Sequence, residues 1–329
     1  MKENLCEAAA KRVRGGIFPA LPLTCGKNGE LDDAAQHRYI QYMKQQPADG
    51  FTIWAHTGRG LLIDRETRNY VFQQWRKEFP DRFLIAGAGA NLAQCAKSTD
   101  PEAEFLTRSL EMAESAKELG ADAIMVYAPV IYRGVADQDE KVKEYYRLMS
   151  KPGLPIIAFY LYEAAGGISY SKELLRCILN MPQVLGIKMA TLDSVMTYQE
   201  VSEMVGKEFP DKVLITGEDR MFGYTLMRGA QAALVGIGSA CTSLQKNMMN
   251  AYYQKRYEEF LSLSLKVDQL AECTFVTPME GYIKRMLAIL ELLGVIPHSA
   301  AYDSFGPIQE LPSAEMKKIE SVLKSIGEI

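Results

Sequence analysis

The chain has 329 residues, of which 48% are hydrophobic and 24% are charged, and its net charge at pH 7 is −4. This composition excludes extended disorder, and the slight acidity excludes a general affinity for nucleic acid or anionic membrane surfaces. No stretch reaches the roughly 18 consecutive apolar residues of a membrane span, and the amino terminus lacks a signal-peptide core. Six scattered cysteines without a C-x-x-C pair, together with only three histidines, lead us to expect a cytoplasmic protein with free thiols and no metal site.

Short apolar runs alternate with longer amphipathic segments along most of the chain. Eight strand–helix units of this kind are typical of a parallel sheet with helical crossovers, and closure into a barrel takes about 250 residues. We therefore predict a TIM (β/α)8 barrel over residues 1–243 and a C-terminal helical extension over 244–329 that packs on it. An open doubly wound sheet is the alternative, but no G-x-G-x-x-G sequence follows the first strand. The expected strands are 16–23, 50–55, 83–90, 122–129, 154–161, 184–190, 212–218 and 232–238.

The second expected strand ends in the sequence Ala55-His56-Thr57-Gly58-Arg59-Gly60. In a barrel of this kind the chemistry lies at the carboxyl ends of the strands. His56, Thr57 and Arg59 offer an imidazole, a hydroxyl and a guanidinium there, and the glycines let backbone N–H groups approach a ligand. A tight turn with a wall histidine and a solvated arginine is the alternative interpretation.

The fifth and sixth expected strands carry a tyrosine and a lysine in apolar surroundings. Because side chains alternate between the two faces of a strand, Lys188 shares a face with two small residues, and Tyr160 lies opposite Phe159. If the bulky residues pack outward under the helices, Tyr160 and Lys188 point into the barrel. Burial lowers the pKa of a lysine, so a nucleophilic amine that attacks a ketone is expected, with the tyrosine relaying protons. A snorkelling lysine and a core tyrosine are the structural alternatives.

Several segments resemble the dihydrodipicolinate synthase/N-acetylneuraminate lyase family of Schiff-base class I aldolases, and the likeness covers nearly the whole chain. They are FPALPLTCGKNGELD, IAGAGAN, GADAIMVYAP, GIKMA, ITGED and YIKRMLAILELLGVI. The resemblance implies that Lys188 is the Schiff-base lysine and Tyr160 the proton-relay tyrosine. It also places Thr57 in the motif that holds the keto-acid carboxylate, and Gly217 and Leu234 along the pocket, the latter through its backbone. A homotetramer built from two dimers is implied as well.

The sequence departs from the family pattern around this site. His56 stands where the carboxylate motif has its first threonine or serine, and Arg59 where it has glutamate. The family's Tyr-Asn-x-Pro becomes Tyr160-Leu161-Tyr162-Glu163, and its second-substrate arginine becomes Ala165. One extra residue after the fourth strand leaves the family's tyrosine there on either Ile131 or Tyr132. The keto-acid half of the site is thus retained, while the second half is changed.

These observations predict a class I aldolase or lyase that takes pyruvate or a related 2-keto acid together with an aldehyde. His56, Thr57 and Gly58 would hold the carboxylate, and no cofactor is needed because the iminium serves as the electron sink. Contacts to the variable part of the substrate are expected from Arg59, Arg133, Tyr132, Tyr162 and Glu163. One alternative is a 2-keto-3-deoxy sugar acid dehydratase in which Glu163 or His56 assists loss of a hydroxyl. Another is a non-catalytic keto-acid-binding protein, and a phosphate- or flavin-binding barrel is a weaker third.

Overall fold

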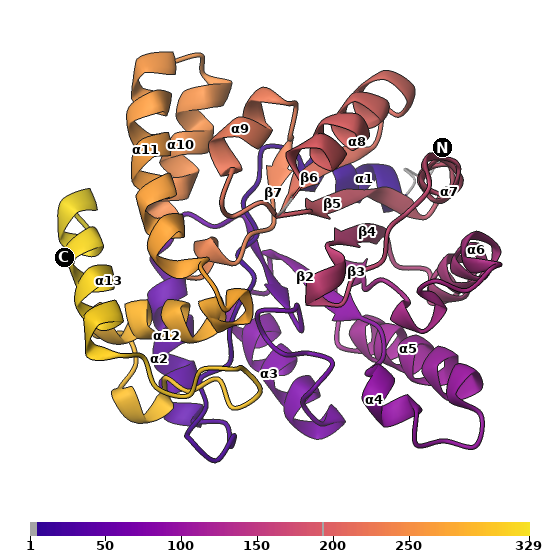
Figure 1. Ribbon diagram of the computed structural model, residues 1–329, viewed down its shortest axis with the longest axis horizontal. Helices are drawn as coiled ribbons and strands as arrows, with labels where there is room; N and C mark the ends of the chain where they lie inside the picture. The colour runs from indigo at the N-terminus through magenta and orange to yellow at the C-terminus, as the bar shows by residue number, and fades with distance from the viewer. Residues whose placement is uncertain (1–4, 193) are drawn as a thin grey trace.

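The computed structural model describes residues 5–192 and 194–329. Its centre is a sheet of seven parallel strands that follow one another in chain order, each paired with the next. All residues of these strands are buried, because helices cover one face and the strands enclose the other. This arrangement, seen in Figure 1, confirms the expected parallel α/β architecture. The strands are β1 (Gly50–Ile53), β2 (Phe83–Ala88), β3 (Ala123–Val126), β4 (Ile156–Leu161), β5 (Val184–Ala190), β6 (Val213–Thr216) and β7 (Ala232–Ala233).

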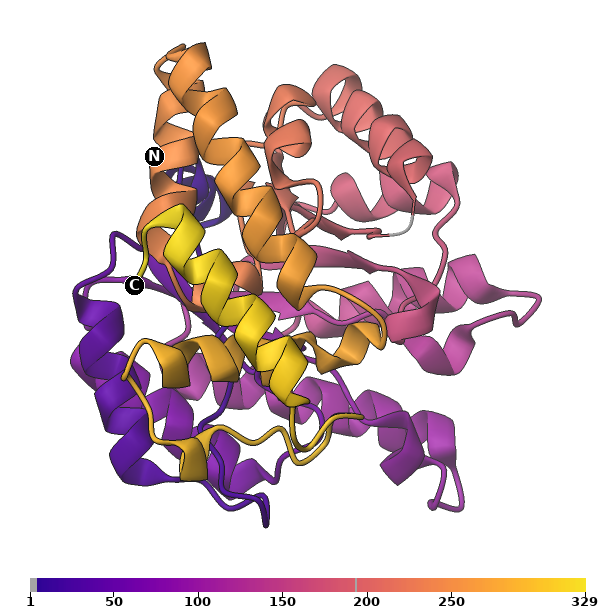
Figure 2. The ribbon, with the colours of Figure 1, turned by 60° about the vertical axis from the view of Figure 1, so that its left-hand side comes forward.

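Helices surround the strands, and the last four helices gather on one side of the molecule (Figures 1 and 2). Most crossover helices begin at a polar cap, as in α3, where the Asp64 side chain accepts a hydrogen bond from the backbone N–H of Thr67. Among the described residues no helix is long and apolar enough to cross a membrane. The helices are α1 (Leu5–Val13), α2 (Asp33–Lys44), α3 (Arg65–Glu78), α4 (Leu92–Cys95), α5 (Pro101–Glu118), α6 (Gln138–Met149), α7 (Lys172–Leu179), α8 (Val195–Glu208), α9 (Phe222–Met227), α10 (Thr242–Tyr253), α11 (Tyr257–Thr274), α12 (Tyr282–Leu292) and α13 (Ser313–Ile326).

The segment expected to form the first strand, residues 16–23, is not a strand in the structure. It makes two isolated parallel bridges instead, one from Ile17 to Ala233 and one from Ala20 to Thr52. Proline has no backbone N–H, so Pro19 and Pro22 cannot donate to a ladder, and regular pairing is interrupted. The segment therefore lies between β7 and β1 and contacts both, but irregularly.

Buried apolar side chains form two clusters, one inside the ring of strands and one between the strands and the helices. Helix α1 contributes residues such as Val13 to the inner cluster. Arg12 and Arg14, at the end of this helix, donate to the carbonyl groups of Asp81, Asp211 and neighbouring residues, which precede β2 and β6. Helix α1 therefore covers the amino-terminal ends of the strands and leaves their carboxyl-terminal ends uncovered by this helix.

After β7 the described chain contains helices and loops. Helix α11 packs against α10 and α13, and α13 crosses in front of α12 in Figure 2. The division of the chain at residue 243 stays a prediction. The loops before and after α12 reach the carboxyl ends of the strands, where Glu280 and Asp303 contact Arg59.

Candidate active site

Lys188 lies on the inner face of β5, as the sequence predicts. Its neighbours Ile187 and Met189 belong to the outer cluster, whereas Lys188 pairs in register with Phe159, which belongs to the inner one. The Lys188 Nζ lies 4.2 Å from the centroid of the Phe159 ring, and only 6% of the residue is exposed. The lysine is thus enclosed against an aromatic ring on the inner side of the strands rather than extended to solvent.

Gly217 makes room for the lysine. A Cβ atom at position 217 would lie 2.4 Å from the Lys188 Cε and 2.8 Å from the carbonyl oxygen of Met189. Any larger residue there would displace the lysine side chain or the backbone of β5. Gly217 thus lies directly beside Lys188, and its expected contact with the substrate stays a prediction.

Burial lowers the pKa of Lys188 to about 8, although the carboxylates of Asp219 and Glu218 oppose this shift. Burial also raises the pKa of Asp219 to about 7, against the effects of a hydrogen bond from Ile237 N–H and of the Lys188 charge. The Asp219 carboxylate accepts that hydrogen bond at 2.7 Å, whereas Glu218 accepts from Thr191 and from the backbone N–H of Leu192. Burial thus shifts the pKa of an amine and that of a carboxyl group in this site toward neutrality.

The expectation that Tyr160 points into the barrel is wrong. Tyr160 belongs to the outer cluster, and its ring lies 5.2 Å from that of Tyr170, between β4 and the helices. The inner face of β4 carries Ile157, Phe159 and Leu161. The bulky side chains therefore point inward on this strand, and the residue next to the lysine is a phenylalanine, which has no proton to relay.

The turn after β1 packs tightly against its own backbone and against segment 16–23. A Cβ at Gly58 would lie 2.6 Å from the carbonyl oxygen of Leu21, and one at Gly60 would lie 2.1 Å from that of Trp54. Trp54 and Arg59 adopt left-handed φ angles of 61° and 52°, which side chains other than glycine rarely adopt. Close contacts with the surrounding backbone therefore require glycine at both positions, and the expected approach of a ligand to the backbone N–H of Gly58 stays a prediction.

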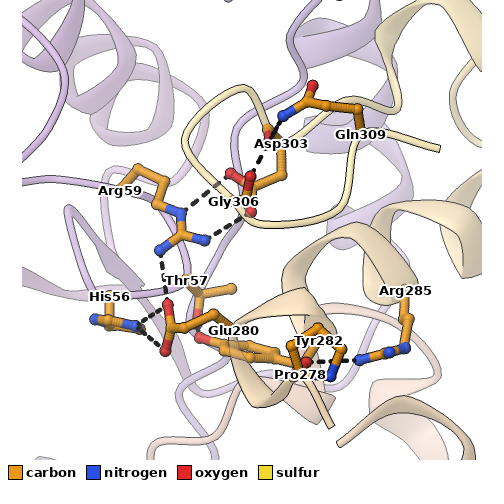
Figure 3. Close-up of polar contacts among 10 residues, drawn as sticks. All are labelled: His56, Thr57, Arg59, Pro278, Glu280, Tyr282, Arg285, Asp303, Gly306 and Gln309. Carbon is orange, nitrogen blue, oxygen red and sulfur yellow. Dashed lines mark hydrogen bonds and ion pairs between the residues drawn. The ribbon is translucent and has the colours of Figure 1, made fainter. Parts of the chain in front are cut away.

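Arg59 and His56 bind carboxylates of the C-terminal part of the chain (Figure 3). Arg59 donates through Nε and Nη2 to the two oxygens of Asp303, at 3.1 and 2.7 Å, and through Nη1 to Glu280 at 2.9 Å. Both Glu280 oxygens also lie 2.9 Å from the His56 Nε2. His56 and Arg59, which we expected to contact the substrate, thus bind carboxylates of the protein itself.

Thr57 is paired with a tyrosine from α12. Its Oγ1 lies 2.9 Å from the Tyr282 hydroxyl oxygen, and the Tyr282 ring stacks on Phe275 with a centroid distance of 4.6 Å. Gly236 approaches both partners, because a Cβ there would lie 3.0 Å from the tyrosine ring and 3.4 Å from the threonine oxygen. Two hydroxyl groups that share one hydrogen bond keep a second hydrogen available for another acceptor.

The other expected residues lie at different distances from this centre. Tyr132 donates to Glu102 at 3.0 Å at the start of α5 and lies on the outer side, so its expected contact with the substrate stays a prediction. Tyr162 packs against the inner cluster. Glu163 is exposed and accepts a 2.6 Å hydrogen bond from Ser169. Leu234 is fully buried in the inner cluster just after β7.

A cavity of about 530 Å³ opens at the carboxyl ends of β1–β4. Leu161 and Tyr127 belong both to its wall and to the inner cluster, and the Tyr127 ring packs on Phe159 with centroids 6.0 Å apart. Lys188 is not part of this wall, but its Nζ lies over the same Phe159 ring, 4.2 Å from the centroid. The cavity is lined by His56, Arg59, Gly60, Leu61, Leu62, Ala90, Asn91, Leu92, Tyr127, Ala128, Val130, Arg133, Leu161, Ala165 and Gly166.

Comparison with known proteins places this architecture in a family. Residues 14–325 match the dihydrodipicolinate synthetase family. The chain belongs to this family. It is 26% identical to the N-acetylneuraminate lyase of Escherichia coli strain SMS-3-5 over 316 residues, which cover 94% of this chain and 96% of that protein. The expected membership of the dihydrodipicolinate synthase/N-acetylneuraminate lyase family is confirmed, and with it the expectation of an enzyme of the lyase class.

Solved structures share the fold of this dihydrodipicolinate synthetase family member. Dihydrodipicolinate synthase from Oceanobacillus iheyensis superposes with a TM-score of 0.81 at 16% identity, covering 98% of this chain and all of the other. An N-acetylneuraminate lyase from Clostridium difficile, crystallised with mannosamine, gives a TM-score of 0.79 at 18% identity, covering 94% and 98% of the two chains. At these identities the likeness concerns the fold.

Sequence reasoning did not assign a role at the site to Phe159, Asp219, Glu280, Tyr282 or Asp303. Asp219 directly follows an expected strand, but a carboxylate at this position also favours the start of the next helix, so its position alone does not indicate a role in the site. The three residues of the C-terminal part carry no local pattern that indicates contact with a turn more than 200 residues earlier.

Proposed function

We propose that this family member is a class I lyase that forms an imine between Lys188 and the keto carbon of pyruvate or a related 2-keto acid. The observation that carries the proposal is the buried lysine on the inner face of β5, whose pKa burial lowers to about 8. A lysine of this kind supplies neutral amine near physiological pH, and neutral amine is the form that attacks a ketone.

The reaction that we propose runs through an iminium and an enamine. The Lys188 amine adds to the keto carbon, water leaves, and loss of a proton from the neighbouring carbon gives the enamine. This carbon then bonds to an aldehyde, or in the reverse direction is released from one. We assign the proton transfers to Asp219 in place of Tyr160, because its carboxyl group, with a pKa of about 7, is available in both forms near neutrality.

Thr57 and Tyr282 are proposed to bind the carboxylate of the keto acid. Their hydroxyl groups share one hydrogen bond at 2.9 Å, which leaves one O–H hydrogen for an acceptor. Arg59 is not assigned this role, because Asp303 and Glu280 already bind its guanidinium group. A dehydratase working through the same imine is the alternative reaction, with His56 or Glu163 assisting loss of a hydroxyl.

Reductive trapping tests the imine. The protein is incubated with pyruvate and borohydride, and the added mass is mapped by peptide mass spectrometry. We expect the adduct on Lys188 and none on Lys284, a second buried lysine whose Nζ donates to the Ala301 carbonyl. The Lys188→Arg variant should not trap. An intact protein that gives no adduct with any of a series of 2-keto acids contradicts the proposal, and an adduct without turnover of any aldehyde or sugar acid would favour a keto-acid-binding protein.

Two larger-scale proposals accompany this function. Segment 16–21 is proposed to complete the ring of strands between β7 and β1, on the basis of its bridges to both. The homotetramer implied by the resemblance stays a prediction, which sedimentation of the purified protein would test.

A further inference from the structure

The cavity at the carboxyl ends of β1–β4 is lined mainly by apolar side chains. Leucine is the most frequent residue of its wall, alanine and valine lie between the leucines, and the rings of Tyr127 and His56 complete it. The apolar members come from four separate segments of the chain, so the character of the cavity does not depend on one loop. They are Leu61, Leu62, Ala90, Leu92, Ala128, Val130, Leu161 and Ala165.

The polar side chains of the wall are already engaged by the protein itself. Arg59 binds Asp303 and Glu280, and His56 binds Glu280. The Tyr127 hydroxyl donates to the Trp54 carbonyl at 2.8 Å, and the Asn91 side chain accepts from two backbone N–H groups at the start of α4. These contacts occupy the Arg59 guanidinium, the His56 Nε2, the Tyr127 hydroxyl and the Asn91 oxygen, so few side-chain groups of the wall are left to bind a polar ligand.

Arg133 is the remaining charged residue of the wall. Its Nη2 donates to the carbonyl groups of Glu163 and Gly167, so it holds the turn after β4 in place. The residue is exposed, and water therefore screens its charge. A second substrate carrying a carboxylate would find no arginine in this cavity that is buried and open to bidentate binding.

The cavity lies where the second substrate of the proposed reaction would be. The Lys188 Nζ lies 4.2 Å from the centroid of the Phe159 ring. The Tyr127 ring, which forms part of the cavity wall, packs against the same ring with centroids 6.0 Å apart. Leu161 lies two residues beyond Phe159 on the inner face of β4 and forms part of the wall. A substrate bonded to Lys188 and extending toward the end of β4 would therefore enter the cavity with the part that the aldehyde contributes.

From this we infer that the second substrate is an aldehyde with an apolar body, such as an aromatic aldehyde, rather than a sugar or a carboxylate-bearing semialdehyde. The inference rests on the proposed function. In the addition, the enamine carbon bonds to the aldehyde carbon, and the electron pair of the carbonyl bond passes to its oxygen, which takes up a proton. Water then hydrolyses the iminium, releasing Lys188 and a 2-keto-4-hydroxy acid with the apolar group on its fourth carbon.

A sugar aldehyde suits the cavity poorly for a physical reason. Each hydroxyl group that leaves water without a new partner costs free energy, and most polar groups of the wall already have partners. An aromatic ring, in contrast, gains from removal of its surface from water against leucine side chains. We therefore expect kcat/KM for benzaldehyde to exceed that for N-acetylmannosamine or glyceraldehyde by about tenfold or more.

The test measures consumption of pyruvate with benzaldehyde, N-acetylmannosamine, glyceraldehyde and aspartate semialdehyde, alongside the borohydride adduct with pyruvate alone. The variants Leu62→Gln and Leu92→Gln place an amide in the wall, and Leu261→Gln makes the same change on the exposed surface of α11. We expect the two wall variants to lose about fivefold or more in kcat/KM for benzaldehyde. Their adduct with pyruvate should form at an unchanged rate, and Leu261→Gln should match the unmodified protein.

The outcomes separate this inference from the function on which it rests. If the pyruvate adduct forms but a sugar aldehyde or aspartate semialdehyde reacts as well as benzaldehyde, the apolar substrate class is wrong and the imine chemistry stands. Equal losses in Leu261→Gln and the wall variants would likewise overturn the role of the cavity. If no pyruvate adduct forms at Lys188, the proposed function fails and the inferred substrate fails with it.

Discussion

At the scale of single residues, the position of Lys188 depends on the absence of a side chain at residue 217. In the Gly217→Ala variant the new Cβ would lie 2.4 Å from the Lys188 Cε, so the lysine has to move. We expect borohydride trapping with pyruvate to slow by about tenfold or more, because small displacements of reacting groups lower rates strongly. Gly206→Ala in α8 is the matched control, since a Cβ there meets no atom within 4 Å. Equal trapping in the two variants would show that the contact is unimportant.

The outward position of Tyr160 leads us to predict that removal of its hydroxyl group has little effect on activity. Its ring packs against Tyr170 in the outer cluster, away from Lys188. The Tyr160→Phe variant retains this ring and should keep kcat within about threefold of the unmodified protein, since a group outside the site supplies little transition-state stabilisation. Asp219→Asn, by contrast, should lower kcat by about a hundredfold or more if this carboxyl group transfers protons. Steady-state kinetics of both variants decides between the two residues, and a large loss in Tyr160→Phe alone would return the role to the tyrosine.

At the scale of elements, the alternation of residues predicts the face of Lys188 correctly and that of Tyr160 incorrectly. Both faces of β4 are buried and apolar, so hydrophobicity does not distinguish inside from outside on this strand. The pairing of β4 and β5 also shifts by one residue between Ile156 and Ile157. An irregularity of this kind changes which residues lie opposite one another, and spacing along the chain does not reveal it. The order of strands and helices was predictable, because it depends on patterns within each segment.

The contacts of Arg59 illustrate what local patterns cannot predict. Its partners lie on the 3₁₀ turn Met279–Gly281 and in the loop after α12, and only the packing of the C-terminal part brings them to the turn after β1. The sequence therefore identifies Arg59 as a charged residue at a strand end, consistent with a role in substrate binding. In the structure, the Arg59 guanidinium group instead pairs with the carboxylates of Glu280 and Asp303.

The buried contact between Arg59 and Asp303 should matter for stability. Asp303 is 4% exposed and Arg59 is 7% exposed, so loss of one partner leaves the other charge buried with only Glu280 beside it. We expect Asp303→Asn to lower the free energy of unfolding by about 2–4 kcal/mol. Asp137→Asn is the control, since this exposed residue precedes α6 without a side-chain cap. Urea unfolding measures both, and a loss below about 0.5 kcal/mol for Asp303→Asn would show that the pair contributes little.

At the scale of the whole molecule, Glu280 links the stability of the fold to pH. Burial alone would raise the pKa of its carboxyl group, but the hydrogen bond from His56 and the charge and hydrogen bond of Arg59 outweigh burial and hold it at about 2. Its ordinary value is 4.5, so the unfolded chain binds the proton more tightly than the folded protein. The stability that this carboxylate contributes is therefore present above about pH 4.5 and is lost as the pH falls toward 2.

Between pH 6 and pH 3 we expect this group to cost the protein about 1–2 kcal/mol of unfolding free energy. The Glu280→Gln variant should be less stable than the unmodified protein at pH 6 and should lose correspondingly less on acidification. Urea unfolding at the two pH values measures both changes. If the free energy of unfolding falls equally in the two proteins between pH 6 and pH 3, Glu280 is not the source of the pH dependence.

The ion pairs of Arg59 with Glu280 and Asp303 also affect the order in which parts of the chain can fold during synthesis. The turn that carries Thr57 and Arg59, and then Lys188, leaves the ribosome well before Glu280 and Asp303. Until those residues emerge, a nascent sheet that folds has to bury the Arg59 guanidinium without its two carboxylates, which is costly. Packing of the turn after β1 is therefore coupled to the emergence of Glu280 and Asp303, so a chain that stops before them leaves this end of the sheet incomplete.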